Sequence, residues 1–451
     1  MLLVTSLLPT RAEGQQGNNA VYKNATTCCQ KSVAFIDASV FENSSTDICT
    51  VLNGILSGTS TTYPAGGAVI DGRGINSSNT TMTCAASPWG SGSGYLNVPS
   101  TILLPATGAN PIIIPGTWIL PNNTHLLGEG DNDPYVSTPN TTIQACLPSA
   151  NSCSFTGTDM IDLGTSFICD PLNNGTVCNN VSVEHLALDA QGQFLNGIVN
   201  TNAQNGSSVD HVSLYRILGT GLSVSGNANN SGPYSNIVYD LGGNSGTSAT
   251  VCASVNGLSG TYGIHGLSCI SENNVAPAAV LLDSSNNSIE DVIIAGFYDG
   301  IRVGANANAL SNVLVNIIGD TGTPQGLTPI NVVHITSVHT VSDLSIMGAN
   351  NAGGNSGTVT IQDDLTGATL TNTSVGIYAL GEAPSSGIGY SRFTTSPGQP
   401  TWAVGTSHPS GSCARGSLYS CVGGSTSCKN GSGTPYALWD CLLSTGWTGV
   451  R

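Results

Sequence analysis

The chain contains few basic residues. Of its 451 residues only 10 are Lys or Arg, against 26 Asp or Glu, so the formal net charge is −16 at pH 7. A nucleic-acid-binding protein needs a basic face to neutralise phosphates. Attraction to an anionic membrane surface needs clusters of Lys and Arg. The composition therefore excludes nucleic acid as a partner and argues against acidic lipid surfaces.

Charged residues of both signs are also scarce, at 8% of the chain. Helical proteins fill their exposed helix faces with Glu, Lys and Arg. Here Asn, Ser, Thr and 57 Gly must supply the polar surface, a composition typical of strands and turns. Hydrophobic residues make up 39%, which is enough for a long core and excludes global disorder. We expect an all-β protein.

Several motifs that mark common activities are missing. The sequence has no P-loop, no His-Glu-x-x-His and no Cys-x-x-Cys, which disfavours nucleotide and zinc chemistry of those kinds. It has no run of 18 apolar residues, so no membrane span is expected. Residues 1–8 form a short apolar run, and small residues up to Ala12 would allow cleavage there, so 1–12 is a candidate signal-peptide remnant. We expect a protein that is secreted or exposed at the cell surface.

The 14 cysteines point to an oxidising compartment. Several lie close together across polar loops, a spacing that favours small disulfide loops over a metal site. The predicted disulfides are Cys146–Cys153, Cys169–Cys178, Cys421–Cys428 and Cys413–Cys441. For Cys28 and Cys29 the partners Cys49 and Cys84 are candidates only, and the pairing of Cys252 and Cys269 stays open.

The residues between 13 and 66 are mostly polar, with one amphipathic stretch. Apolar residues at 48, 51, 52, 55 and 56 follow helical spacing and predict a helix over 46–57, capped by Thr46 or Asp47. We expect this helix to cover the open end of the fold that follows.

A repeat dominates the rest of the chain. Eight segments, starting 21 to 31 residues apart, begin with an apolar residue, and we expect their first, fourth and sixth positions to face inward. The third position always holds a residue that tolerates a left-handed backbone, and it predicts a tight turn between two strands. Short strands repeated at this period predict a β-solenoid, since a propeller blade would need about 40–50 residues. The third-position residues are His185, His211, Asn236, Gly266, Asp291, Asn312, Asp343 and Asn372.

Three segments before the repeats carry a family resemblance. Residues 67–74 (GAVIDGRG), 102–105 (ILLP) and 118–130 (WILPNNTHLLGEG) resemble the first coils of the pectate lyase-like superfamily, especially its rhamnogalacturonase and epimerase-like branch. The resemblance implies a right-handed parallel β-helix over 67–382. A linker over 383–400 and a small disulfide-stapled β module over 401–451 would follow it. This fold hosts lyases, hydrolases, epimerases, adhesins and phage tailspikes, so it implies no single activity.

The repeat also places candidate site residues. Asp189, Tyr215 and Asp240 occupy the same position in three consecutive units, and Arg216 follows Tyr215. We expect these residues to share one solvent-accessible outer face. In a hydrolase one Asp would be the acid and the other the base. The resemblance to pectate lyases implies a different mechanism for a lyase: the Asp pair would hold Ca²⁺, and Arg216 would abstract the proton.

Two functions remain open at this point. The first is a secreted enzyme, a hydrolase or lyase, acting on a pectin-like or other uronate-containing polysaccharide. Tyr215, Arg302 and Asp299 would then bind substrate. The second is a non-catalytic extracellular β-helix, such as an adhesin, a glycan-binding surface protein or a tailspike-like stalk. The polygalacturonase motifs and the Arg-x-x-x-x-Arg of pectate lyases are missing, and the resemblance therefore transfers no catalytic residue. No cofactor is expected beyond Ca²⁺ in the lyase case.

Overall fold

The computed structural model is built mostly of β-strands. It describes residues 34–131, 140–169 and 177–244 without interruption, most of 246–303, strands between 310 and 378, and most of 402–450. The predicted signal-peptide remnant over 1–12 and the linker over 383–400 lie outside the described residues. The expectation of an all-β protein is confirmed for the part that is described.

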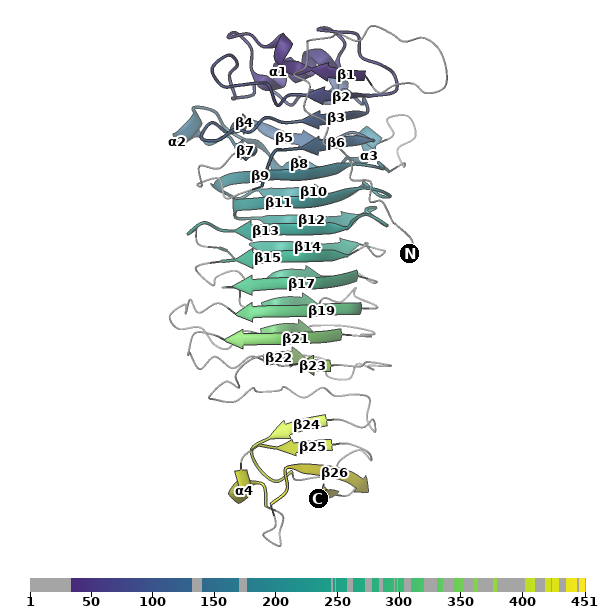
Figure 1. The fold of residues 1–451 in the computed structure, drawn as a ribbon, viewed down its shortest axis with the longest axis vertical. Coiled ribbons are helices and arrows are strands. Elements are labelled where there is room, and N and C mark those ends of the chain that lie inside the picture. The colour runs from purple at the N-terminus through teal and green to yellow at the C-terminus, as the bar shows by residue number, and fades with distance from the viewer. Residues whose placement is uncertain are drawn as a thin grey trace, which may run out of the picture.

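Two long sheets carry most of the strands, and every pairing within them is parallel (Figure 1). In spatial order the first sheet holds β1 (Ala34–Asp37), β2 (Ala68–Asp71), β3 (Ser100–Leu103), β6 (Thr124–Leu127), β9 (Ser182–Gln193), β11 (Ser208–Ile217), β13 (Tyr234–Asp240), β15 (Ile264–Ile270), β17 (Asn287–Ala295), β19 (Leu310–Gly319), β21 (Leu344–Asn351) and β23 (Gly376–Tyr378). Beside β9 lies β7 (Thr142–Ala145), which pairs in turn with β4 (Ile112–Ile114).

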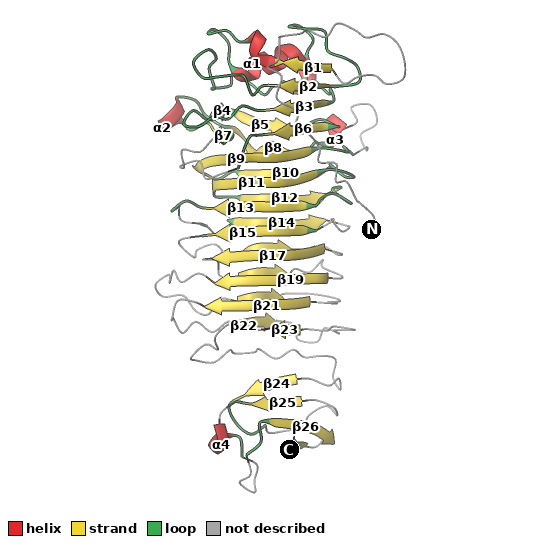
Figure 2. Ribbon diagram, in the orientation of Figure 1, coloured by secondary structure: helices red, strands yellow, loops and turns green. Residues whose placement is uncertain are grey.

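The second sheet runs in the order β22 (Thr360–Asp363), β20 (Asn331–Ile335), β18 (Asp299–Val303), β16 (Ala278–Leu282), β14 (Val251–Gly257), β12 (Thr220–Gly226), β10 (Asn196–Asn200), β8 (Thr156–Asp162) and β5 (Gly116–Ile119). From β8 to β23 successive strands alternate between the two sheets. Figure 2 shows these strands stacked along the longest axis, with helices at the ends of strands, in the N-terminal region and beside the C-terminal strands. This arrangement is compatible with a β-helix.

A third sheet lies within 401–451, where the small module is predicted. It contains β24 (Trp402–Gly405), β25 (Leu418–Cys421), β26 (Leu438–Leu443) and β27 (Gly446–Val450). The described helices are short: α1 (Ile48–Leu56), α2 (Pro148–Asn151), α3 (Ser166–Cys169), α4 (Gly424–Ser427) and the 3₁₀ turns η1 (Ala38–Phe41) and η2 (Gly92–Gly94). Among the described residues, none of these helices has the length and apolar character needed to cross a membrane.

The core is a set of apolar ladders formed by equivalent positions of successive repeats. The sixth positions Leu188, Leu214, Tyr239, Cys269 and Ile294 stand in register and are at most 3% exposed. Burial of a Leu or Ile side chain in such a ladder contributes about 1.5–3 kcal/mol. The first and fourth positions stand in register in the same way and are buried, so the predicted inward set is confirmed for the described units.

The third position of the repeat has the predicted left-handed backbone. The φ angles are 54° at His185, 50° at His211, 53° at Asn236, 67° at Gly266 and 55° at Asp291. The prediction of a turn between two strands was wrong, however, because β9 and β11 each continue through this residue as one bent strand. Pairing holds on both sides of the bend, and the left-handed residue therefore redirects the strand without ending it.

Helix α1 confirms the helix predicted over 46–57. The Asp47 carboxylate caps it by accepting a hydrogen bond from the Thr50 N–H at 3.0 Å. Its buried face contains Ile48, Val51, Leu52, Ile55 and Leu56, which join the same core as the inward residues of the sheets. In Figure 1 the helix lies beside β1 and β2, at the N-terminal end of the first sheet.

Disulfides are present at three of the predicted pairs, Cys146–Cys153, Cys169–Cys178 and Cys421–Cys428. Two more bonds join Cys49 to Cys84 and Cys252 to Cys269. The candidate pairing of Cys28 and Cys29 with Cys49 and Cys84 was therefore wrong, because those two cysteines bond to each other. Cys441 is also disulfide-bonded, but Cys413 lies outside the described residues, so their pairing stays a prediction. The disulfides are compatible with an extracellular protein.

Candidate functional site

Three of the predicted site residues lie side by side. In the pairing of β9, β11 and β13, Tyr215 is the register partner of both Asp189 and Asp240. Because adjacent strands are about 4.8 Å apart, the two aspartates are separated by about 9.6 Å along the sheet. The sequence repeat therefore placed these residues in the right register.

Asp189, however, is not accessible to solvent. Its exposed fraction is 1%, so the expectation of an accessible carboxylate was wrong. Oδ1 accepts hydrogen bonds from the Gln191 N–H at 2.8 Å and from Arg216 Nε at 2.9 Å. Oδ2 accepts from Gln144 Nε2 at 2.9 Å and from Arg216 Nη2. The carboxylate is covered because β7 brings Gln144 next to it, which the repeat pattern did not include.

Arg216 reaches this carboxylate through an unusual backbone conformation. Its φ is 49°, and the register of β11 on β9 shifts between Tyr215 and Ile217. The Arg216 side chain is 23% exposed, and its guanidinium carbon lies over the Tyr215 ring, 5.2 Å from the ring centroid. An Arg stays charged in proteins, and here a carboxylate holds it in a fork. This arrangement does not fit a catalytic base.

Asp240 and Tyr215 form the more open part of the cluster, since both are partly exposed. Asp240 Oδ1 accepts a hydrogen bond from the Gly242 N–H at 2.7 Å. Gly242 has a φ of 56°, and a Cβ at this position would collide with the Tyr215 hydroxyl, so only glycine lets the ring lie there. Phe194, directly after the end of β9, is 67% exposed.

Arg302 is not part of this cluster. It belongs, with Asp299, to β18 in the second sheet, where Arg302 pairs in register with Leu281 and His334. The side chain of Asp299 lies outside the described residues. The prediction that these two residues share the site with Tyr215 is therefore wrong for Arg302.

Two acidic residues on β8, Asp159 and Asp162, are not among the site residues predicted from the sequence. Burial, together with the negative charge of Asp159, raises the pKa of Asp162 to about 7. Its Oδ1 is buried and has no hydrogen-bond partner within the described residues. Asp159 accepts a hydrogen bond from Asn196 Nδ2 at 2.6 Å. Two Asp three residues apart are a weak sequence signal, because the effect depends on what covers the strand.

Calcium does not fit the predicted Asp pair. Ca²⁺ takes six to eight oxygen ligands, whereas both oxygens of Asp189 already accept hydrogen bonds, two of them from a guanidinium. A bound cation would have to displace Arg216 from its partner. No step of a mechanism is therefore assigned to Ca²⁺ at this cluster.

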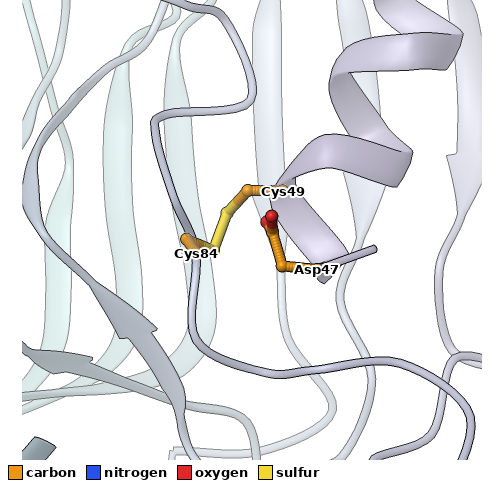
Figure 3. A group of neighbouring side chains, drawn as sticks. All are labelled: Asp47, Cys49 and Cys84. Carbon is orange, nitrogen blue, oxygen red and sulfur yellow. A yellow bond between two sulfur atoms is a disulfide. The ribbon is translucent and has the colours of Figure 1, made fainter. Parts of the chain in front are cut away.

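Within the part of the chain that the structure describes, two groups of residues bring metal-ligating atoms together. In the first, Asp47, Cys49 and Cys84 lie close together at the start of α1. Figure 3 shows that the two sulfurs are bonded to each other, so they offer no thiolate to a metal. The second group is His185, Asp210 and His211, at the bend of β9 and β11.

Comparison of the chain with protein-family models and with curated proteins finds no match.

Proposed function

We propose that this chain is an extracellular right-handed parallel β-helix protein that binds a neutral polysaccharide at Tyr215 and Asp240. The β-helix is supported by the alternation of successive strands between two parallel sheets. The binding site rests on one observation: a partly exposed ring and a partly exposed carboxylate stand in register on adjacent strands, on a rigid base. Aromatic rings with a polar edge are well suited to contact with sugars.

Binding is favoured over cleavage at this cluster because Asp189 is locked. An inverting hydrolase needs two carboxyl groups with a water between them. Here one of the two is 1% exposed and its oxygens are taken by four donors. We assign Asp189 and Arg216 the task of holding Tyr215 in place.

The proposal of a neutral glycan follows from charge. The Asp189–Arg216 pair is neutral as a unit, and the protein as a whole carries a net charge of −16. Such a field repels a polyuronate. This departs from the uronate-containing substrate that the sequence had favoured.

A second function, glycoside hydrolysis, is favoured by Asp162. A carboxyl group with a pKa raised to about 7 stays protonated at mildly acidic pH and can then act as a general acid. Asp159, whose charge contributes to that shift, would be the second carboxylate. Both lie on β8 in the second sheet, whereas Tyr215 lies on β11 in the first sheet.

A polysaccharide panel of neutral and uronate-containing glycans separates these functions. Binding is measured by affinity electrophoresis, and cleavage by reducing ends and by absorbance of unsaturated uronides, with and without Ca²⁺. We expect saturable binding to a neutral glycan that Tyr215→Ala weakens about tenfold, the order of one aromatic contact. Arg302→Gln, in the other sheet, is the matched control and should leave binding unchanged.

Each alternative has its own result. Stronger binding to a polyuronate would overturn the neutral-glycan proposal. Release of reducing ends that stops in Asp162→Asn would support the hydrolase. Release that stops in Asp189→Asn, with the protein still folded by circular dichroism, would restore the catalytic pair predicted from the sequence.

A further inference from the structure

Two histidines lie on top of each other where β9 and β11 bend. His185 and His211 occupy the left-handed position of consecutive repeats, and their rings stack with centroids 4.8 Å apart and planes inclined by 26°. The other described residues in this column are Asn236, Gly266 and Asp291. The backbone therefore accepts several residue types here, and it does not by itself require two imidazoles.

A carboxylate adjoins the pair. Asp210 Oδ2 lies 2.9 Å from His211 Nδ1. Oδ1 is held by the next strand, accepting hydrogen bonds from Ser235 Oγ at 2.6 Å and from Asn236 Nδ2 at 3.0 Å. Its orientation is thus fixed by groups that do not belong to the histidine pair, as outer-shell partners fix the ligands of a metal.

We propose that His185, Asp210 and His211 bind a divalent transition cation, with Zn²⁺ as the expected ion. One ligand atom from each residue lies within 4.8 Å of the other two. Imidazole nitrogen with one carboxylate is a donor set that favours zinc over calcium or magnesium. Three protein ligands leave the fourth position of a tetrahedral site to water.

Closing the site needs only small side-chain movements. Zinc–ligand bonds of about 2.0–2.2 Å place the ligand atoms of a tetrahedral site about 3.4 Å apart. The His211 side chain is 45% exposed and Asp210 is 34% exposed, so the groups can rotate toward a common centre without opening the core. Glu184, the register partner of Asp210, adds negative charge on the same strands and favours a cation there.

Titration with ZnCl₂ followed by calorimetry tests the proposal, with Co²⁺ as a spectroscopic substitute. We expect one Zn²⁺ per chain, and we expect His185→Asn and His211→Asn each to weaken it about 100-fold, since even outer-shell changes cost 10–100-fold. Asparagine suits the left-handed backbone, as Asn236 shows in the same column, and the variants should therefore keep the fold. His265→Gln on β15 is the matched control and should bind normally.

A second measurement does not depend on variants. In the unmodified protein, zinc should shift the imidazole ring resonances of His185 and His211 and leave that of His265 in place. Uniform shifts of all histidines, or stoichiometric binding that survives both Asn substitutions, would overturn the proposal. Absence of Zn²⁺ binding would overturn it as well, and none of these results bears on glycan binding at Tyr215.

Discussion

Replacing Asp189 by Asn should destabilise the protein far more than a typical substitution of an outward-facing strand residue does. The substitution keeps the shape of the side chain and removes its charge. Asn Oδ1 can still accept the hydrogen bond from the Gln191 N–H. The other atom becomes an NH₂ group that faces two donors, Gln144 Nε2 and Arg216 Nη2. Arg216 is left without its counter-ion.

The structure sets the size of the loss. Breaking a buried ion pair by removing one partner costs about 3–5 kcal/mol, since the remaining charge is uncompensated. Asp189 is 1% exposed, which places it in this class. The Arg216 side chain is 23% exposed, so water can solvate part of the stranded guanidinium. We therefore expect the lower end, about 3 kcal/mol.

Urea denaturation measures the loss of unfolding free energy, provided that its dependence on urea concentration (the m-value) is unchanged. Asp240→Asn is the matched control. Asp240 is partly exposed and its Oδ1 accepts from the Gly242 N–H, a bond that Asn preserves, so we expect a cost below about 1 kcal/mol. In a double-mutant cycle with Arg216→Gln, the coupling should exceed about 1.5 kcal/mol. Equal losses in Asp189→Asn and Asp240→Asn would refute the argument that Asp189 is a structural residue.

Three further outcomes follow from other parts of the molecule. Burial raises the pKa of Asp162 to about 7, so the folded state loses stability as pH rises from about 4 to about 7, by about 4 kcal/mol. In urea melts across this range Asp162→Asn should flatten that slope, and an unchanged slope would contradict the assignment. Gly242→Ala should cost about 1–3 kcal/mol and weaken glycan binding, because φ is 56° and the new methyl meets the Tyr215 hydroxyl; normal stability and binding would count against the site. Replacing Cys252 and Cys269 together by Ala should cost about 3 kcal/mol, as expected for a bond closing a loop of 17 residues, with thermal melts under reducing conditions as the control.

The repeat predicted most of the local structure of the sheets, for reasons that lie within each unit. Alternating apolar residues select the inward face, and the buried positions Leu188 and Leu214 follow that rule. His185 and His211 were expected in the left-handed column because few residue types tolerate that backbone, and their φ angles agree. Both signals depend on a few neighbouring residues, and a sequence contains that information directly.

The environment of Asp189 could not be predicted in the same way. The repeat gave its register correctly, but its burial comes from Gln144, on a strand that lies before the first repeat unit. Arg216 adopts a left-handed backbone that Arg has no intrinsic preference for, and nothing in the local sequence marks it. The pairing of Cys252 with Cys269 likewise joins β14 and β15, which belong to different sheets. These features depend on which segments meet in space.

The Asp189–Arg216 pair and the histidine pair illustrate two uses of a strained backbone. A left-handed non-glycine residue costs about 1–3 kcal/mol and persists only where its surroundings fix it. At Arg216 a buried, fully bonded carboxylate supplies that restraint, and the conformation contributes to a rigid base under Tyr215. At His185 and His211 the side chains are left partly exposed, with their ring edges beside a single ordered carboxylate. In the first arrangement the charged groups are fully engaged in hydrogen bonds that hold the fold. In the second, donor atoms stay available to a ligand. For this reason we place the cation at the bend of the strands and the glycan beside the locked ion pair.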